Sequence, residues 1–123
     1  MSIRSGADAV RHETPNAVMR TLAAPSTGAQ ELSVWEVTMA AGARGPVHTA
    51  DREQVWSVLS GALEAIVAGE SCPASAGETL LLAAGVERQI LAVTDFVALV
   101  ASGSGATVTT PDSPASRPLP WAA

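Results

Sequence analysis

Residues 45–61 read GPVHTADREQVWSVLSG, and this stretch is the most informative in the 123-residue chain. A polar turn at residues 51–53 separates a short segment containing His48 from the apolar run Val55–Leu59, and Gly61 follows that run. Short apolar runs bounded by polar and glycine residues are typical of β-strands joined by tight turns. The stretch therefore predicts two consecutive strands, with a histidine on the first.

The rest of the chain repeats this pattern. No long segment has the 3.6-residue period of an amphipathic helix, and short apolar runs alternate with Gly, Pro, Ser and Asp every eight to twelve residues or so. We predict a single all-β domain of two antiparallel sheets, with a hairpin turn at Gly69–Glu70. The expected strands are 17–24, 31–40, 47–50, 54–60, 62–68, 78–83, 88–93, 96–102 and 106–110.

The ends of the chain differ from this strand-rich region. Residues 1–16 are expected to form an N-terminal arm, 17–110 the β-domain and 111–123 a tail. The tail holds four of the eight prolines, so it cannot supply a central strand. Trp121 near its end either pins the tail to the domain or clamps a partner subunit.

Composition excludes several classes of protein. The net charge is −5 and the seven basic residues, all arginine, are scattered, which argues against a nucleic-acid partner. No run approaches the ~18 apolar residues of a membrane span, and the N-terminus has no apolar signal core, so we expect a cytoplasmic protein without a membrane partner. The one cysteine, Cys72, excludes an internal disulfide, and we expect it to be a passive thiol. His12 is expected at the solvated surface.

Two motifs resemble those of the cupin family. The first family motif reads His-x-His, three or four residues, Glu, six residues, Gly, and counting back from Gly61 places His48, Ala50 and Gln54 at the three ligand positions. The second reads Gly, five residues, Pro-x-Gly, two residues, His. Residues 77–88, GETLLLAAGVER, keep both glycines, but Ala83 replaces the proline and Arg88 the histidine.

This resemblance covers about half of the chain, residues 42–102. It implies a cupin-like jelly-roll barrel whose pocket lies between the two sheets, commonly in a homodimer. Pairing at exposed sheet edges also makes a homodimer plausible. Only one of the four metal-ligand positions of the family keeps its histidine in this chain.

Side-chain alternation predicts which residues face that pocket. If His48 points inward, Ala50 does too, while the next strand turns Gln54, Trp56 and Val58 to one face. Arg88, Ile90 and Ala92 share the inner face of a later strand. We expect Gln54, Trp56, Val58 and Ile90 to contact a small-molecule ligand, although Trp56 is also consistent with a plain core residue.

A metal site is poorly supported by these residues. His48 supplies one nitrogen, Gln54 a neutral amide oxygen, and Ala50 nothing, while a divalent catalytic site usually needs three protein ligands. Arg88 would repel the ion. A divalent metal on His48 stays possible only with Gln54, Asp51 or Glu53 as further ligands, so no cofactor is the expected state.

Arg88 suggests a different site. A buried guanidinium must be paired, either with Asp51, Glu53 or Glu87, or with an anionic group of a ligand. In the second case Arg88 would stabilise negative charge and His48 would act beside it as general acid or base.

Three hypotheses on function follow from these residues. The first is a non-oxidative enzyme of small-molecule or secondary metabolism, which isomerises, cyclises or dehydrates a largely apolar substrate with catalytic residues His48 and Arg88 and Gln54 as the orienting group. The second is a non-catalytic ligand-binding or sensing module. The third is an atypical metal-dependent cupin resembling the family's oxygenases.

Overall fold

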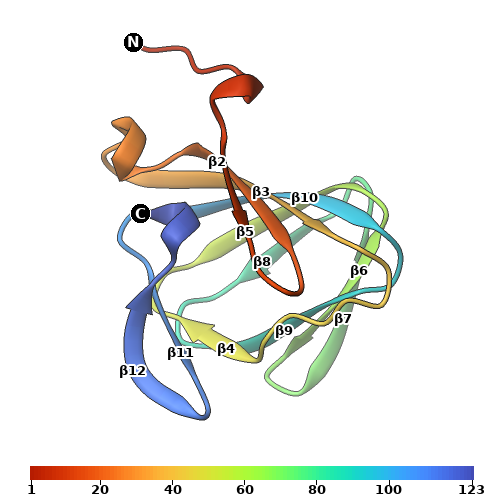
Figure 1. Cartoon of the computed structure of the whole chain (residues 1–123). Helices are drawn as coiled ribbons and strands as arrows, with labels where there is room; N and C mark the ends of the chain where they lie inside the picture. The colour runs from red at the N-terminus through yellow and green to blue at the C-terminus, as the bar shows by residue number, and fades with distance from the viewer.

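The protein is a sandwich of two six-stranded antiparallel sheets, described here by a computed structural model of residues 1–123 (Figure 1). One sheet has the order β1-β2-β3-β10-β5-β8 and the other the order β12-β11-β4-β9-β6-β7. The strands are β1 (Val10–Glu13), β2 (Val18–Ala23), β3 (Leu32–Met39), β4 (His48–Ala50), β5 (Gln54–Ser60), β6 (Ala62–Val67), β7 (Glu70–Ser75), β8 (Thr79–Leu82), β9 (Glu87–Ala92), β10 (Phe96–Gly103), β11 (Thr107–Thr110) and β12 (Ser113–Pro118).

Helix is confined to three single turns of 3₁₀ type: η1 (Gly6–Asp8), η2 (Pro25–Thr27) and η3 (Pro120–Ala122). None of them is long and apolar enough to cross a membrane. The all-β prediction is thus confirmed, and each of the nine expected strands is present with ends that shift by no more than a few residues.

The sequence analysis did not predict three of the strands, and all three lie at sheet edges. β1 is polar, while β7 and β12 contain proline, which removes a backbone donor and is tolerated only where one side of the strand is free. The expected turn at Gly69–Glu70 lies one residue earlier, at Ala68–Gly69, where both residues have positive φ. The arm and the tail therefore each add an edge strand to the domain.

The core between the sheets is mostly aliphatic, with Trp35, Trp56 and Phe96 as its aromatic members. Inward residues alternate strictly along β3, β5, β9 and β10, where buried and partly exposed positions follow one another. The predicted inward faces of β5 (Gln54, Trp56 and Val58) and β9 (Arg88, Ile90 and Ala92) are all buried. Strand parity is thus what turns the candidate site residues toward the space between the sheets.

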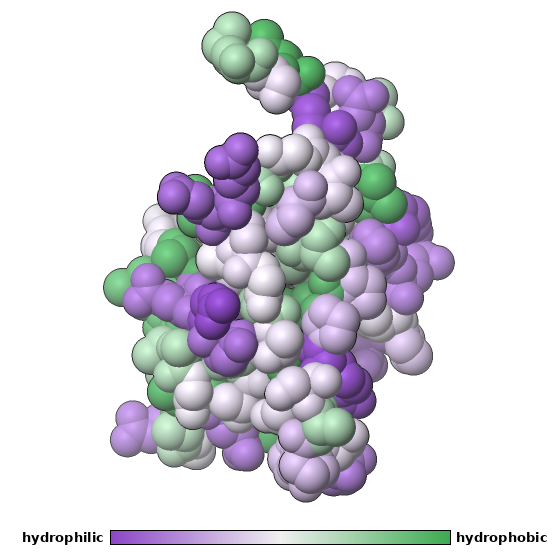
Figure 2. All heavy atoms as spheres, turned by 90° about the vertical axis from the view of Figure 1, so that its left-hand side faces the viewer, coloured by the Kyte–Doolittle hydropathy of each residue, from purple (hydrophilic) through white to green (hydrophobic).

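The two chain ends behave differently. The first residues project from the body, with Met1 and Ile3 largely exposed, and Figure 2 shows the same projection from the side. On that side of the molecule hydrophilic residues are interspersed with neutral and apolar ones (Figure 2). The C-terminal turn η3 instead packs on the first sheet (Figure 1), where Ser33 Oγ donates to the carbonyl of Ala122 at 2.7 Å.

Gly61 is the turn residue on which the β5–β6 hairpin depends. Its φ is +75°, and a Cβ placed on it would lie 1.9 Å from the carbonyl oxygen of Asp95. Gly77 has a similar φ of +90° but nothing within 4 Å of such a Cβ. A comparison of alanine substitutions at Gly61 and Gly77 therefore separates the cost of an unfavourable φ from the cost of a steric clash.

We predict that Gly61→Ala lowers the free energy of unfolding by about 3 kcal/mol or more, because overpacking adds to an unfavourable φ. Gly77→Ala should cost only about 1–2 kcal/mol, from the φ term alone. Urea denaturation of both variants measures the difference. Equal losses would contradict the close approach of Asp95 to Gly61.

Candidate functional site

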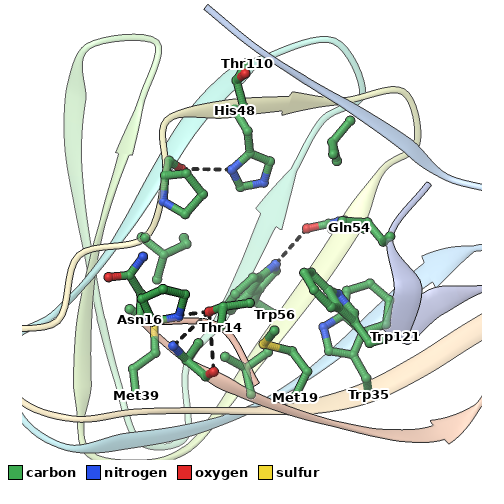
Figure 3. Close-up of a pocket in the computed structure, with 18 of the residues that line it drawn as sticks. Thr14, Asn16, Met19, Trp35, Met39, His48, Gln54, Trp56, Thr110 and Trp121 are labelled. Atoms are coloured by element: carbon green, nitrogen blue, oxygen red, sulfur yellow. Dashed lines mark hydrogen bonds between the residues drawn. The ribbon is translucent and has the colours of Figure 1, made fainter. Parts of the chain in front are cut away.

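A cavity of about 380 Å³ lies between the two sheets (Figure 3). One wall comes from β2, β3 and β5 of the first sheet, and the other from β4, β9 and β11 of the second. The β1–β2 turn and the C-terminal tail border it as well. Its lining residues are Thr14, Pro15, Asn16, Ala17, Met19, Trp35, Val37, Met39, Gly45, Pro46, His48, Gln54, Trp56, Ile90, Val108, Thr110, Arg117, Leu119 and Trp121.

All three tryptophans of the chain line this one cavity. Trp35 and Trp56 project from β3 and β5, and Trp121 reaches it from η3 (Figure 3). The chain contains only one other aromatic residue of the Phe, Tyr and Trp class, Phe96, and that one is buried in the core. The aromatic surface of the protein is therefore concentrated at the cavity, where it suits a flat, apolar molecule.

Gln54 has a fixed orientation at the cavity wall. The indole N–H of Trp56 donates to Gln54 Oε1 at 3.0 Å, and an indole nitrogen can only donate, so the amide oxygen must face Trp56. The amide NH₂ of Gln54 makes no hydrogen bond within the protein and is not sealed off from the cavity. It is thus a free donor for a ligand.

His48 is held as a neutral base. Its Nδ1 lies 3.0 Å from the carbonyl oxygen of Pro46, which can only accept, so Nδ1 carries the proton. The lone pair is then on Nε2, and Figure 3 shows the ring extending into the cavity. Burial lowers the pKa of His48 below its ordinary value of 6.5; the bond to Pro46 opposes this shift and the charge of Arg88 adds to it.

Arg88 lies directly across from His48 in the pairing of β4 and β9. Only 1% of its surface is exposed, and its single hydrogen bond runs from Nη2 to the carbonyl oxygen of Ala83 at 2.8 Å. Its Nε and Nη1 have no partner. Burial accordingly lowers the pKa of Arg88. The molecule thus holds a buried cation without a counter-charge.

Of the two alternatives for Arg88, pairing with Asp51, Glu53 or Glu87 is wrong. Asp51 instead accepts from the backbone and the hydroxyl of Thr107, at 2.7 and 3.0 Å, and so ties the β4–β5 turn to β11. Glu53 and Glu87 point to solvent. Arg88 does not line the cavity, so its charge reaches a bound molecule through the protein and not by contact.

Among the other predicted residues, Gln54, Trp56 and Ile90 line the cavity as expected, together with His48. Val58 does not: it is 2% exposed and belongs to the core further along β5. The alternation of side chains correctly predicted that Val58 points inward. Alternation does not tell whether an inward residue lines the cavity or lies in the solid core. His12 is half-buried and meets Trp121 edge to face, with ring centroids 6.5 Å apart.

Sequence reasoning missed most of the other lining residues, among them Trp35, Trp121 and Arg117. Trp35 could have been found, because strict alternation along 32–39 turns Ser33, Trp35, Val37 and Met39 inward together. Trp121 and Arg117 carry no such signal. They reach the cavity only because the proline-containing tail folds back across it.

The residues present do not fit the divalent metal that the family resemblance implies. No group of three His, Cys, Asp or Glu side chains could hold an ion. Of the four motif positions, His48 offers one nitrogen, Gln54 has its oxygen engaged by Trp56, Ala50 has no donor atom and Arg88 is cationic. The donor set is that of a polar pocket and not of a metal centre.

Comparison with known families finds one match. The family model described as Cupin domain matches residues 35–102, more than half of the chain. A search of curated proteins found no match to this chain.

Solved structures share the fold at low identity. An RmlC-like cupin from Shewanella frigidimarina has a TM-score of 0.74 at 18% identity, covering 85% of this chain and 92% of its own. KdgF from Halomonas sp. has a TM-score of 0.73 at 19% identity, covering 84% and 93%. Salicylate 1,2-dioxygenase from Pseudoaminobacter salicylatoxidans, solved with gentisate, has a TM-score of 0.66 at 21% identity over 72% of this chain, which spans only 25% of the dioxygenase.

We predict that Arg88→Met leaves the free energy of unfolding within about 1 kcal/mol of wild type or raises it, because a buried cation without a counter-charge is replaced by an apolar chain of similar length. Urea denaturation checks this. As a control, Arg20→Met breaks the 3.1 Å ion pair with Glu36 at the half-exposed surface and should cost less than about 1 kcal/mol. A loss above about 3 kcal/mol for Arg88→Met would mean that the guanidinium is paired after all.

Proposed function

The chain belongs to the cupin family, and we propose that it binds a small planar molecule with a carbonyl or acidic group and transfers a proton on it, with His48 as the base. The observation that carries the proposal is the fixed lone pair of His48 Nε2 in a cavity lined by three tryptophans. Fold alone does not assign this chemistry, because one fold hosts many activities.

The shape of the cavity supports a planar ligand. Its volume of about 380 Å³ lies at the small end of the range for ligand sites, and its wall is mostly aromatic and aliphatic. Trp35, Trp56 and Trp121 line the cavity, and a conjugated ring or enone that enters it would contact their indole rings. Polar groups on the wall, such as those of His48 and Gln54, would then fix the orientation of the ligand.

The charge of the site supports an electron-rich ligand. No Asp or Glu lines the cavity, while Arg117 does and Arg88 lies buried beside His48. This is a locally positive site in a chain whose net charge is −5. Such a site favours a carboxylate, a phenolate or an enolate over a cation.

These groups are sufficient for one proton-transfer cycle. Nε2 of His48 would take a proton from a carbon next to the ligand carbonyl, and the C–H electron pair would move toward the carbonyl oxygen to form an enolate. The amide N–H of Gln54 and the charge of Arg88 would stabilise that negative charge. Return of the proton to another carbon completes an isomerisation with no oxidant or reductant.

The second candidate is ligand binding without turnover. One observation favours it: His48 is the only residue of the cavity lining whose side-chain type titrates near neutral pH. The cavity therefore has no second acid or base that could pass a proton to or from His48. A pocket that has kept its shape but lost the metal-ligand set is consistent with a sensing module. A metal-dependent reaction is disfavoured by the donor chemistry of the four motif positions.

We predict that the wild-type protein exchanges deuterium into an aromatic keto acid such as phenylpyruvate in D₂O faster than buffer does, as followed by proton NMR. His48→Gln should lower the excess rate by about 10²-fold or more, because the base is gone, while quenching of tryptophan fluorescence still reports binding. Arg11→Gln, at an exposed residue outside the cavity lining, is the control and should keep full activity.

Binding without exchange would identify the non-catalytic module. An absence of binding by every planar carbonyl compound, aromatic acid or amide tested would contradict the whole proposal.

We also propose that the protein forms a homodimer through β8, on the free edge of the first sheet. Of the four edge strands, β7 and β12 contain proline and β1 carries Arg11 and Glu13, all of which discourage edge pairing. β8 has neither, and Leu81 on it is 70% exposed. A second copy would cover both the free backbone and this leucine.

Analytical ultracentrifugation is expected to find a dimer for the wild type and a monomer for Leu81→Glu, because a buried carboxylate has no partner there. Val93→Glu, at a residue 58% exposed in the β9–β10 turn, should remain dimeric. A monomeric wild type at micromolar concentration, or a dimer that survives Leu81→Glu, would rule out this interface.

A further inference from the structure

The C-terminal tail forms part of the cavity wall and is held there firmly. Leu119 is buried, and three residues of the tail, Arg117, Leu119 and Trp121, line the cavity. The hydroxyl of Thr21 on β2 donates to the carbonyl of Trp121 at 2.7 Å, and Ser33 on β3 makes the equivalent bond to Ala122. The tail is therefore a fixed wall element that brings its own side chains to the site.

Arg117 is the cation of this tail, and it has no acidic partner. Its only hydrogen bond runs from Nη2 to the hydroxyl of Thr110, at 3.1 Å, and it forms no ion pair. Arg11, Arg20 and Arg52 each lie within 4 Å of a carboxylate, whereas Arg4, Arg44, Arg88 and Arg117 do not. Of these four, only Arg117 lines the cavity. Arg117 is exposed and lines the cavity, where no acidic residue competes for its guanidinium, so it is accessible to an anion that enters.

The position of Arg117 relates it to His48. Strand β11 pairs with β12 on one side and with β4 on the other, through Val108 to Arg117 and through Thr109 to Thr49. The next residue in that register, Thr110, lies beside His48 (Figure 3). Arg117 pairs with Val108, and its side chain reaches along β11 to the hydroxyl of Thr110. The guanidinium is thereby linked to His48 through Thr110, opposite the tryptophan-rich wall.

We propose that Arg117, with the Thr110 hydroxyl, binds the carboxylate of a planar acid and so selects acids over neutral molecules of the same shape. A guanidinium presents two parallel N–H donors that match the two oxygens of a carboxylate. With the carboxylate bound there, the carbons next to it lie toward His48, and the flat remainder of the ligand lies against the tryptophans. The inference rests on the proposed function and narrows its ligand to a planar carboxylic acid.

The test compares an acid with its neutral isostere. Binding of salicylate and of salicylamide is measured by tryptophan fluorescence for wild type, Arg117→Gln and Arg117→Lys. Arg11→Gln removes the same charge from a residue outside the cavity lining and is the matched control. Since Arg117 is exposed, all variants should share the urea midpoint of wild type.

We expect wild type and Arg11→Gln to bind salicylate about tenfold or more tighter than salicylamide. Arg117→Gln should lose about tenfold for salicylate and stay within twofold for salicylamide, and Arg117→Lys should fall between, because it keeps the charge but not the paired donors.

Two failures are distinguishable. Equal binding of acid and amide by wild type, or an equal loss of both in Arg117→Gln, overturns the role of Arg117 and leaves the proposed planar ligand standing. If wild type binds neither compound nor any other planar acid, the proposed function fails and this inference fails with it.

Discussion

A buried guanidinium beside a neutral imidazole is the interaction on which the properties of this site depend. Arg88 and His48 face each other across neighbouring strands, and Arg88 keeps two of its three nitrogens without a partner at 1% exposure. A cation left this way repels any second cation, including a metal ion and a protonated histidine. Burial is the main cause of the lowered pKa of His48, and the charge of Arg88 adds to it. The same charge disfavours a metal ion and favours negative charge in the cavity.

The two walls of the cavity differ because the inward residues of the two facing sheets differ in chemical character. On β5 and β3 the inward positions hold Trp56 and Trp35, and on β4 and β11 they hold His48 and Thr110. Stacking on one wall and polar contacts on the other restrict a ligand in orientation as well as in shape. The hydrogen bond from Trp56 engages the amide oxygen of Gln54, so this side chain can offer a ligand only its N–H groups.

The alternation of side chains along strands and the glycines at turns made the fold and the inward direction of the site residues predictable. The motif spacing placed His48, Gln54, Trp56 and Ile90 on inward faces, and all four line the cavity. Gly61 was expected at a turn, and its positive φ and close approach to Asp95 show why. What parity cannot give is depth: Val58 has the right direction but lies in the core, and Arg88 lies behind the wall instead of on it.

The surroundings of Arg88 and the path of the C-terminal tail could not be predicted from the sequence. The pairing partner of Arg88 was sought among nearby acidic residues, yet Asp51 is taken by Thr107, a contact between segments 56 residues apart. The tail was expected to avoid a central strand, and it does, but its return over the cavity depends on two hydroxyl bonds from Thr21 and Ser33. Such long-range contacts arise from how the two sheets stack, which no local pattern specifies.

The protonation of His48 tests the account most directly. Long-range ¹H–¹⁵N NMR of the imidazole, assigned with a His12→Gln variant, reports which ring nitrogen carries the proton and at what pH the ring titrates. We expect a proton on Nδ1, a bare Nε2 at pH 7 and a pKa of His48 below 6.5. A proton on Nε2, or a pKa above 6.5, would contradict it.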